Sequence, residues 1–258
     1  MTITPLYSLT GLLVGILVGL TGVGGGSLMT PLLVLLFGFH PSVAVGTDLL
    51  YAATTKTAGS LVHAARQSIA WPVVGLLAAG SLPAAIASLW FMARLGHPTD
   101  AVASLITLLL GIMLVLTAFT LLLRQRIMDW AQARQAVIAP RTGQALTVLL
   151  GIALGVAVTL TSVGAGAIGA TVLLLLYPKM PIARVVGTDI AHAIPLALIS
   201  GAGHWYLGSI DLSLLASLLI GSIPGIIIGS LLIPRIRESV LRLFLAAMLL
   251  VVGLVLLF

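Results

Sequence analysis

An apolar segment interrupted by glycine occurs twice in this chain, and it constrains the fold more than any other feature. The first copy is centred on Thr21–Ser27 (TGVGGGS) and the second on Thr161–Ala167 (TSVGAGA). The apolar stretches beside each tract are short for a membrane-spanning helix, which needs about 20 residues. Paired glycine-interrupted segments in corresponding positions of two halves indicate the binding site of a secondary transporter.

The match between the halves continues beyond the glycine tracts. Val45–Asp48 (VGTD) recurs as Val186–Asp189, and Gly80–Pro83 (GSLP) recurs as Gly221–Pro224 (GSIP). An offset of 140 (24 to 164), rising to 141 (48 to 189), aligns all these positions, so the chain is an internal duplication. The duplication predicts an N-terminal repeat, a linker and a C-terminal repeat, at 1–123, 124–142 and 143–258.

Composition identifies the class of protein. Hydrophobic residues make up 60% of the chain and charged residues only 7%, whereas a soluble chain carries about 25% charged residues. We therefore expect an all-α polytopic membrane protein. Its net charge of +6 is attributed to loop residues that set orientation in the bilayer, and no nucleic-acid partner is expected. Cysteine is absent, which excludes disulfides, thiolate metal sites and cysteine catalysis. No cofactor or metal is expected.

Each half is predicted to contain one broken segment followed by three membrane spans. In the first half these lie at 8–37, 43–64, 70–92 and 99–123. In the second half they lie at 144–177, 183–206, 211–233 and 237–257.

The distribution of basic residues favours a re-entrant hairpin for each broken segment. If each broken segment crosses the bilayer once, the loop Lys and Arg residues divide five against five. If each enters and leaves on one side, Arg94 stands alone on one face, and nine residues share the other: Arg66, Arg124, Arg126, Arg134, Arg141, Lys179, Arg184, Arg235 and Arg237. An excess of this kind marks the cytoplasmic face.

The hairpins predict two inverted repeats, because a hairpin plus three spans is an odd number of crossings. The linker would then be cytoplasmic, and both termini would lie outside the cytoplasm. The hairpin tips would approach the midplane of the bilayer from opposite faces, as in many transporters.

The glycine tracts could bind an anion. A break in a membrane helix leaves backbone N–H groups unpaired at the start of the next half-helix, where the peptide dipoles favour negative charge. The alternative is that such glycines only allow close helix packing. We expect substrate contacts from Thr21, Gly22, Gly24, Gly25, Gly26, Ser27, Thr161, Ser162, Gly164 and Gly166, joined by Thr47 and Thr188.

Among the charged residues inside predicted spans, three are candidates for a functional role. A carboxylate at membrane depth is costly and indicates function, so Asp48 and Asp189 are candidates for ion coupling. The alternative is that each caps its own helix near the interface. Lys56 lies eight residues after Asp48, on a similar helix face, and could supply charge to an anion or pair with an aspartate. Snorkelling to the interface is its alternative.

The glycine-rich first segment, the duplicated VGTD motif and the stretch Gly221–Gly225 (GSIPG) resemble the TauE/SafE family of membrane proteins over essentially the whole chain. That resemblance implies export of sulfite or organosulfonates across the bacterial cytoplasmic membrane, coupled to an ion gradient. Many members of the family have a small residue where this chain has Asp48 and Asp189, a departure that suits proton or sodium coupling.

Together these observations predict an inverted-repeat secondary transporter, not an enzyme, that moves a small sulfur-containing oxyanion while one repeat rocks against the other. The expected partners are the anion, the bilayer and a coupling proton or sodium ion, and a homodimer is left open. Two alternatives are a passive anion channel and an intramembrane aspartyl protease that uses both aspartates.

Overall fold

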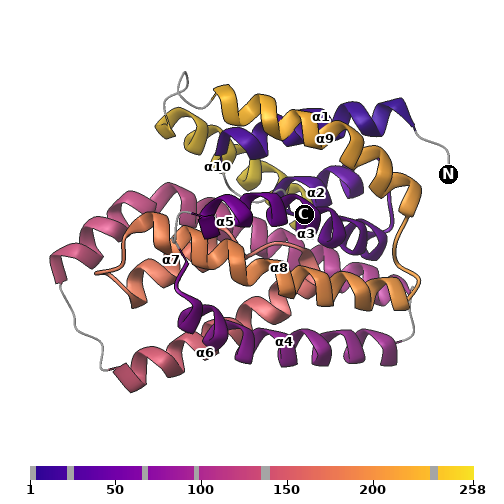
Figure 1. Cartoon of the computed structure of the whole chain (residues 1–258). Helices are drawn as coiled ribbons and strands as arrows, with labels where there is room; N and C mark the ends of the chain where they lie inside the picture. The colour runs from indigo at the N-terminus through magenta and orange to yellow at the C-terminus, as the bar shows by residue number, and fades with distance from the viewer. Residues whose placement is uncertain (1–3, 22–25, 66–68, 96–98, 135–139, 233–237) are drawn as a thin grey trace.

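The computed structural model describes residues 4–21, 26–65, 69–95, 99–134, 140–232 and 238–258, and within these ranges every regular element is a helix (Figure 1). In chain order the helices are α1 (Pro5–Thr21), α2 (Gly26–Leu35), α3 (Pro41–Ala65), α4 (Trp71–Arg94), α5 (Asp100–Arg134), α6 (Pro140–Thr161), α7 (Ala167–Leu176), α8 (Ile182–Tyr206), α9 (Leu212–Leu232) and α10 (Glu238–Leu257). Within the described residues, six helices are long and apolar enough to cross a membrane. The chain is a multi-pass membrane protein.

The long helix α5 continues beyond its predicted end. The expected span stopped at 123, but the helix runs on to Arg134 and has 35 residues, about 50 Å at 1.5 Å per residue. That length exceeds the 30 Å hydrocarbon core of a bilayer. The segment 124–134 (RQRIMDWAQAR) is polar but rich in Arg, Gln, Ala and Met, which favour helix. The helix therefore continues through this polar segment beyond the membrane-spanning part.

Each broken segment forms two helices whose outer ends lie together. Tyr7, near the start of α1, packs edge-on against Phe37, just after α2, with ring centroids 5.2 Å apart. In the second half the hydroxyls of Thr147 in α6 and Tyr177, just after α7, are hydrogen-bonded at 2.7 Å. The two contacts join equivalent positions, since 7 and 147, like 37 and 177, differ by 140. In both halves the two outer ends of the broken segment therefore lie close together.

The most extensive helix contacts join one half of the chain to the other. Helix α1 lies along α9 and α4 lies along α6, at opposite edges of the molecule (Figure 1). Gly11 and Gly15 of α1 meet the backbone at Leu218 and Ser222 of α9, so these two helices run parallel. The glycines let the helix backbones approach closely, as small residues do in membrane proteins.

Two further contacts between the halves, each between equivalent helices, join helices that run in opposite directions. Gly46 of α3 meets His204 of α8, whereas Leu50, one turn later, meets Gly201, so α3 and α8 are antiparallel. Helices α5 and α10 are antiparallel as well, because Gly111 meets Leu257 while Val115 meets Gly253.

Among the clusters of buried apolar residues, two show how each core draws on both halves. One contains Met29 and Leu33 of α2 together with Leu218 of α9. The other contains Leu77 of α4 together with residues of α6, α7 and α8 such as Leu173.

Candidate functional site

The second glycine tract is a tight, irregular turn between α6 and α7. The Thr161 hydroxyl donates to the Ala157 carbonyl at 2.7 Å and accepts from the Val163 N–H at 3.1 Å, which ends α6. Gly164 and Gly166 have φ angles of 127° and 126°, a region that favours glycine. Helix α7 then begins at Ala167, and Gly166 at its N-cap has no side chain that could accept from the first N–H groups.

The Asp189 side chain from α8 occupies the start of α7. The carboxylate interacts with the Gly166 N–H, and it lies so close to Gly169 that a β-carbon there would collide with Oδ1. Asp189 is only 2% exposed, and its Oδ1 has no hydrogen-bond partner among the described residues. A buried carboxylate therefore faces the positive end of a short helix.

The equivalent residue in the first half, Asp48, is held differently. The Thr30 hydroxyl in α2 donates to Asp48 Oδ2 at 2.6 Å, with both side chains buried. The side chain of Ser162, from the glycine tract of the other half, also lies beside this carboxyl. Within the described part of the chain neither Asp48 Oδ1 nor Ser162 Oγ has a hydrogen-bond partner. Asp48 thus brings α2, α3 and the second glycine tract together.

Lys56 links the two aspartates electrostatically. Its half-buried side chain extends from α3 to a position where its charge acts on both Asp48 and Asp189. One ammonium and two carboxylates therefore share one region inside the fold. The alternative in which Asp48 and Asp189 cap their own helices does not describe this arrangement, because both lie well within α3 and α8 and contact other elements.

Four further polar side chains surround this centre in two equivalent pairs. His192 Nε2 of α8 and Ser81 Oγ of α4 are hydrogen-bonded at 2.8 Å. At the matching positions, Tyr51 of α3 lies near Ser222 of α9, and all four residues are buried. The pairs match because 81 and 222, like 51 and 192, differ by 141.

Thr47 and Thr188, which we expected to contact substrate, are buried and hydrogen-bond to the backbone. The Thr188 hydroxyl accepts from the Ala70 N–H at 2.9 Å and donates to the Arg184 carbonyl at 2.6 Å. The Thr47 hydroxyl accepts from the Asp211 N–H at 3.2 Å. The structure therefore does not bring either residue together with the second glycine tract.

Asp211 caps the start of α9. Its carboxylate accepts from the backbone N–H groups of Ser213 and Leu214, both at 2.9 Å, and from the Ser213 hydroxyl at 2.8 Å. Burial raises the pKa of the Asp211 carboxyl, but these hydrogen bonds outweigh burial and hold the pKa below its usual range.

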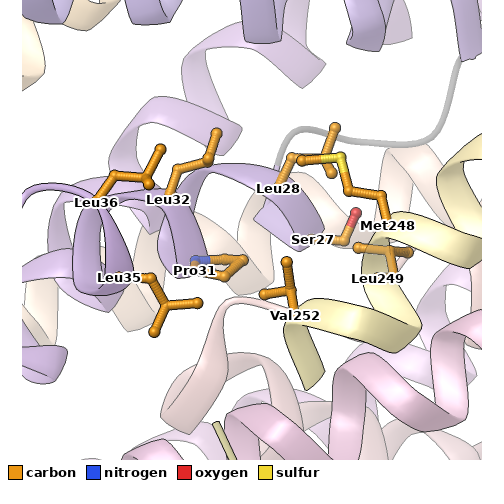
Figure 2. Close-up of a pocket in the computed structure, with 9 residues that line it drawn as sticks. All are labelled: Ser27, Leu28, Pro31, Leu32, Leu35, Leu36, Met248, Leu249 and Val252. Atoms are coloured by element: carbon orange, nitrogen blue, oxygen red, sulfur yellow. The ribbon is translucent and has the colours of Figure 1, made fainter. Parts of the chain in front are cut away.

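Much of the first glycine tract lies outside the described residues. This applies to Gly22, Gly24 and Gly25, and to the surroundings of Thr21 and Gly26. Ser27 is buried in the first turn of α2 and lines a cavity of about 260 Å³ between α2 and α10 (Figure 2). The other lining residues are apolar: Leu28, Pro31, Leu32, Leu35, Leu36, Met248, Leu249 and Val252. This cavity offers an anion almost no polar contact. The candidate site is therefore the cluster of Asp48, Lys56 and Asp189 at the start of α7, which we call the polar centre.

Sequence reasoning missed two residues that contact the aspartates, Thr30 and Gly169. Thr30 is a single hydroxyl in the apolar run after the first tract, three residues beyond Ser27 and on the same helix face. Gly169 completes the spacing Gly164-x-Gly166-x-x-Gly169, in which the third glycine allows another group to approach the helix closely. Both residues are visible in sequence patterns, but the sequence does not show that Thr30 contacts Asp48 or that Gly169 contacts Asp189.

Comparison with known proteins gives consistent results. A family model described as sulfite exporter TauE/SafE matches residues 7–256. The chain is 40% identical to the probable membrane transporter protein YjnA of Bacillus subtilis, over 95% of this chain and 96% of that protein. It is 32% identical to the probable membrane transporter protein YdhB of Bacillus subtilis, over 84% and 85% of the two chains. A probable membrane transporter protein of Xylella fastidiosa is 26% identical over 89% and 85%. No solved structure matches the chain significantly.

Proposed function

The chain belongs to the sulfite exporter TauE/SafE family of membrane transporters, and from that premise we propose that it exports a small sulfur-containing oxyanion, sulfite or an organosulfonate, by coupling to protons or sodium. The observation that carries the proposal is the polar centre, where the start of α7 meets Asp189, Asp48 and Lys56. Charge of both signs inside the fold, next to a broken membrane helix, is expected of a transport site.

The substrate contacts are proposed at the two helix breaks. Backbone N–H groups at Gly164 and Gly166 and the Ser162 hydroxyl would hold the anion, because a helix N-terminus binds negative charge. By duplication, Thr21–Ser27 would supply the matching contacts before α2. Thr47 and Thr188 would contribute only if they released the backbone hydrogen bonds they now make.

We further propose that the halves are inverted repeats with re-entrant hairpins. The Tyr7–Phe37 and Thr147–Tyr177 contacts support hairpins, because a segment that crossed the bilayer once would separate its ends by about 30 Å. The antiparallel pairs α3 with α8 and α5 with α10 support inversion, since equivalent helices related by an axis in the membrane plane run in opposite directions.

The proposed mechanism is alternating access around the polar centre. Because α1 packs on α9 and α6 packs on α4, the moving bodies would each combine helices from both halves. This replaces the expectation that one whole repeat rocks against the other. Asp48 and Asp189 would exchange the coupling ion, and Lys56 would balance the charge of the anion and the carboxylates.

Reconstitution into proteoliposomes tests the proposed function. Labelled sulfite, methanesulfonate and sulfate are offered with and without a pH or sodium gradient, and protein-free vesicles serve as the control. We expect a gradient to drive uphill movement of sulfite or the sulfonate. Absence of flux for every anion under every gradient contradicts the proposal, and flux that only dissipates an anion gradient identifies a passive channel.

A further inference from the structure

The Asp189 carboxylate occupies the place that the proposed function gives to the substrate anion. It comes from α8, contacts the Gly166 N–H and crowds Gly169 in the first turn of α7. Its Oδ1 is buried and has no partner in the described part of the chain, so this oxygen points into the helix start without being satisfied there. A second anion could not share this position.

We propose that Asp189 is a built-in competitor of the substrate: its carboxylate fills the anion site at the start of α7, and the substrate binds there only after Asp189 is protonated or has moved away. The inference rests on the proposed function and adds to it an order of events. Removal of the competing charge, by protonation of Asp189 or by its movement, comes before anion binding, so protonation of Asp189 favours anion binding.

The charges around Asp189 are consistent with competition. The charge of Lys56 of α3 acts on both Asp189 and Asp48, and His192 lies one turn further along α8. The described residues of α7 and the central part of α6 contribute no titratable side chain. One ammonium beside two carboxylates leaves an excess of negative charge, which repels an incoming anion until one carboxylate is neutral.

The two halves differ in a way that assigns this role to Asp189 rather than Asp48. Asp48 accepts from the Thr30 hydroxyl in the second turn of α2, so a side chain already holds it. At the position equivalent to Thr30, α7 has Ala170, which has no donor in its side chain. Asp189 therefore depends on the helix backbone itself, which is also what the substrate would need.

Anion affinity as a function of pH tests the proposal in purified full-length protein. The probe is methanesulfonate, whose charge stays constant between pH 5 and 8, and binding is followed by calorimetry. Wild-type affinity should fall as pH rises, because loss of the proton from Asp189 restores the competing charge. Asp189→Asn, similar in shape but uncharged, should bind at least about tenfold tighter at pH 8, with an affinity independent of pH.

Two matched variants make the result specific. Asp48→Asn should retain the pH dependence that Asp189 imposes, and Asp211→Asn, at the start of α9, should behave like wild type. Thermal unfolding identifies any variant that fails to fold. If Asp189→Asn does not fold, the wild-type measurement tests the inference, because an affinity that does not fall as pH rises contradicts it. Binding by Asp189→Asn that is weaker than wild type, or that keeps the wild-type pH dependence, overturns the inference and leaves the proposed function intact. Failure of every protein to bind any sulfur oxyanion overturns both.

Discussion

At the scale of single residues, the absence of one β-carbon determines how Asp189 is placed. Gly169 lies beneath the carboxylate, and any side chain at that position would push Asp189 away from the start of α7. In the first half a hydroxyl holds the equivalent carboxylate, because Thr30 of α2 donates a hydrogen bond of 2.6 Å to Asp48 of α3. Both contacts are short and buried, so each is sensitive to the smallest substitution.

Gly169→Ala should destabilise the protein by about 1–3 kcal/mol, because the added methyl group must displace the Asp189 carboxylate in a packed interior. Thermal denaturation in detergent measures the change. Gly75→Ala is the matched control, since a β-carbon there meets nothing within 4 Å, and alanine in a helix is favoured over glycine by about 0.5–1 kcal/mol. Equal effects of the two substitutions would contradict the placement of Asp189.

Thr30→Val should cost about 1–3 kcal/mol, because it keeps the side-chain shape but leaves a buried carboxyl without its donor. The denaturation temperature should fall, and gradient-driven flux should fall with it if Asp48 takes part in coupling. Thr30→Ser restores the donor and should recover most of both properties. Full stability in the valine variant would show that the Thr30–Asp48 bond is not needed.

What could be predicted from the sequence at this scale was the identity of the charged residues. Asp48, Asp189 and Lys56 stand out because charge is rare and costly inside apolar spans. Their contacts could not be predicted, because Thr30 and Gly169 are inconspicuous until α3 and α8 are placed against α2 and α7. Thr47 and Thr188 show the converse, since their repeated motif suggested substrate contact, whereas their hydroxyls bond to the starts of neighbouring segments.

At the scale of elements, the decisive feature is the pairing of helix ends at the base of each broken segment. The aromatic contact in the first half and the hydroxyl contact in the second occupy equivalent positions but use different chemistry. The geometry is therefore repeated although the interactions are not. Hydropathy located the long helices approximately, but α6 was expected to be too short to span and is among the six described helices that are long and apolar enough to do so. The family match confirms the resemblance drawn from the motifs.

The extension of α5 was not predicted, because polarity was taken as the end of a span. Bilayer thickness limits the apolar part of a helix but not the helix itself. The residues after 123 favour helix locally, and Gln125 accepts a hydrogen bond from Arg242 of α10 at 3.1 Å, which ties the extension to a neighbouring helix.

Cross-linking tests the hairpin at the level of the element. The chain has no cysteine, so the pairs Tyr7→Cys with Phe37→Cys, and Thr147→Cys with Tyr177→Cys, can be studied without background. A bifunctional thiol reagent with a reach of about 10 Å should join both pairs, because a single crossing would separate them by about 30 Å. The pair Gly111→Cys with Gly253→Cys, where α5 meets α10, is the positive control. If the control links but neither hairpin pair does, the hairpins are wrong.

At the scale of the whole molecule, the halves are interlocked. Helix α1 of the first half packs against α9 of the second half, and α6 of the second half packs against α4 of the first half (Figure 1). Comparing the two halves of the sequence revealed the duplication but not the packing of α1 on α9 and of α6 on α4. Matching positions show which segments are equivalent, and they do not show which segments are in contact. The distribution of basic residues among the loops nevertheless predicts which face of the molecule is cytoplasmic.

Both termini should face away from the cytoplasm. Single cysteines introduced as Thr4→Cys and Phe258→Cys should react in intact cells with a thiol reagent that cannot cross the inner membrane. Arg126→Cys, in the polar extension of α5, should react only after the membrane is broken, because its face carries the excess of basic residues. Protection of Thr4→Cys in intact cells would contradict the proposed topology.

The exchange of edge helices between the halves bears on how such a molecule could have arisen. A polypeptide of half this length would have α1 or α6 without its glycine-faced neighbour, and that surface would remain uncovered until a second copy supplied the missing helix. If the equivalent helices were antiparallel then as they are now, the two copies had to enter the bilayer in opposite senses. An ancestral gene would then have encoded a dual-topology dimer, and fusion through the segment after α5 gave each copy a fixed orientation and its own subsequent history of substitution.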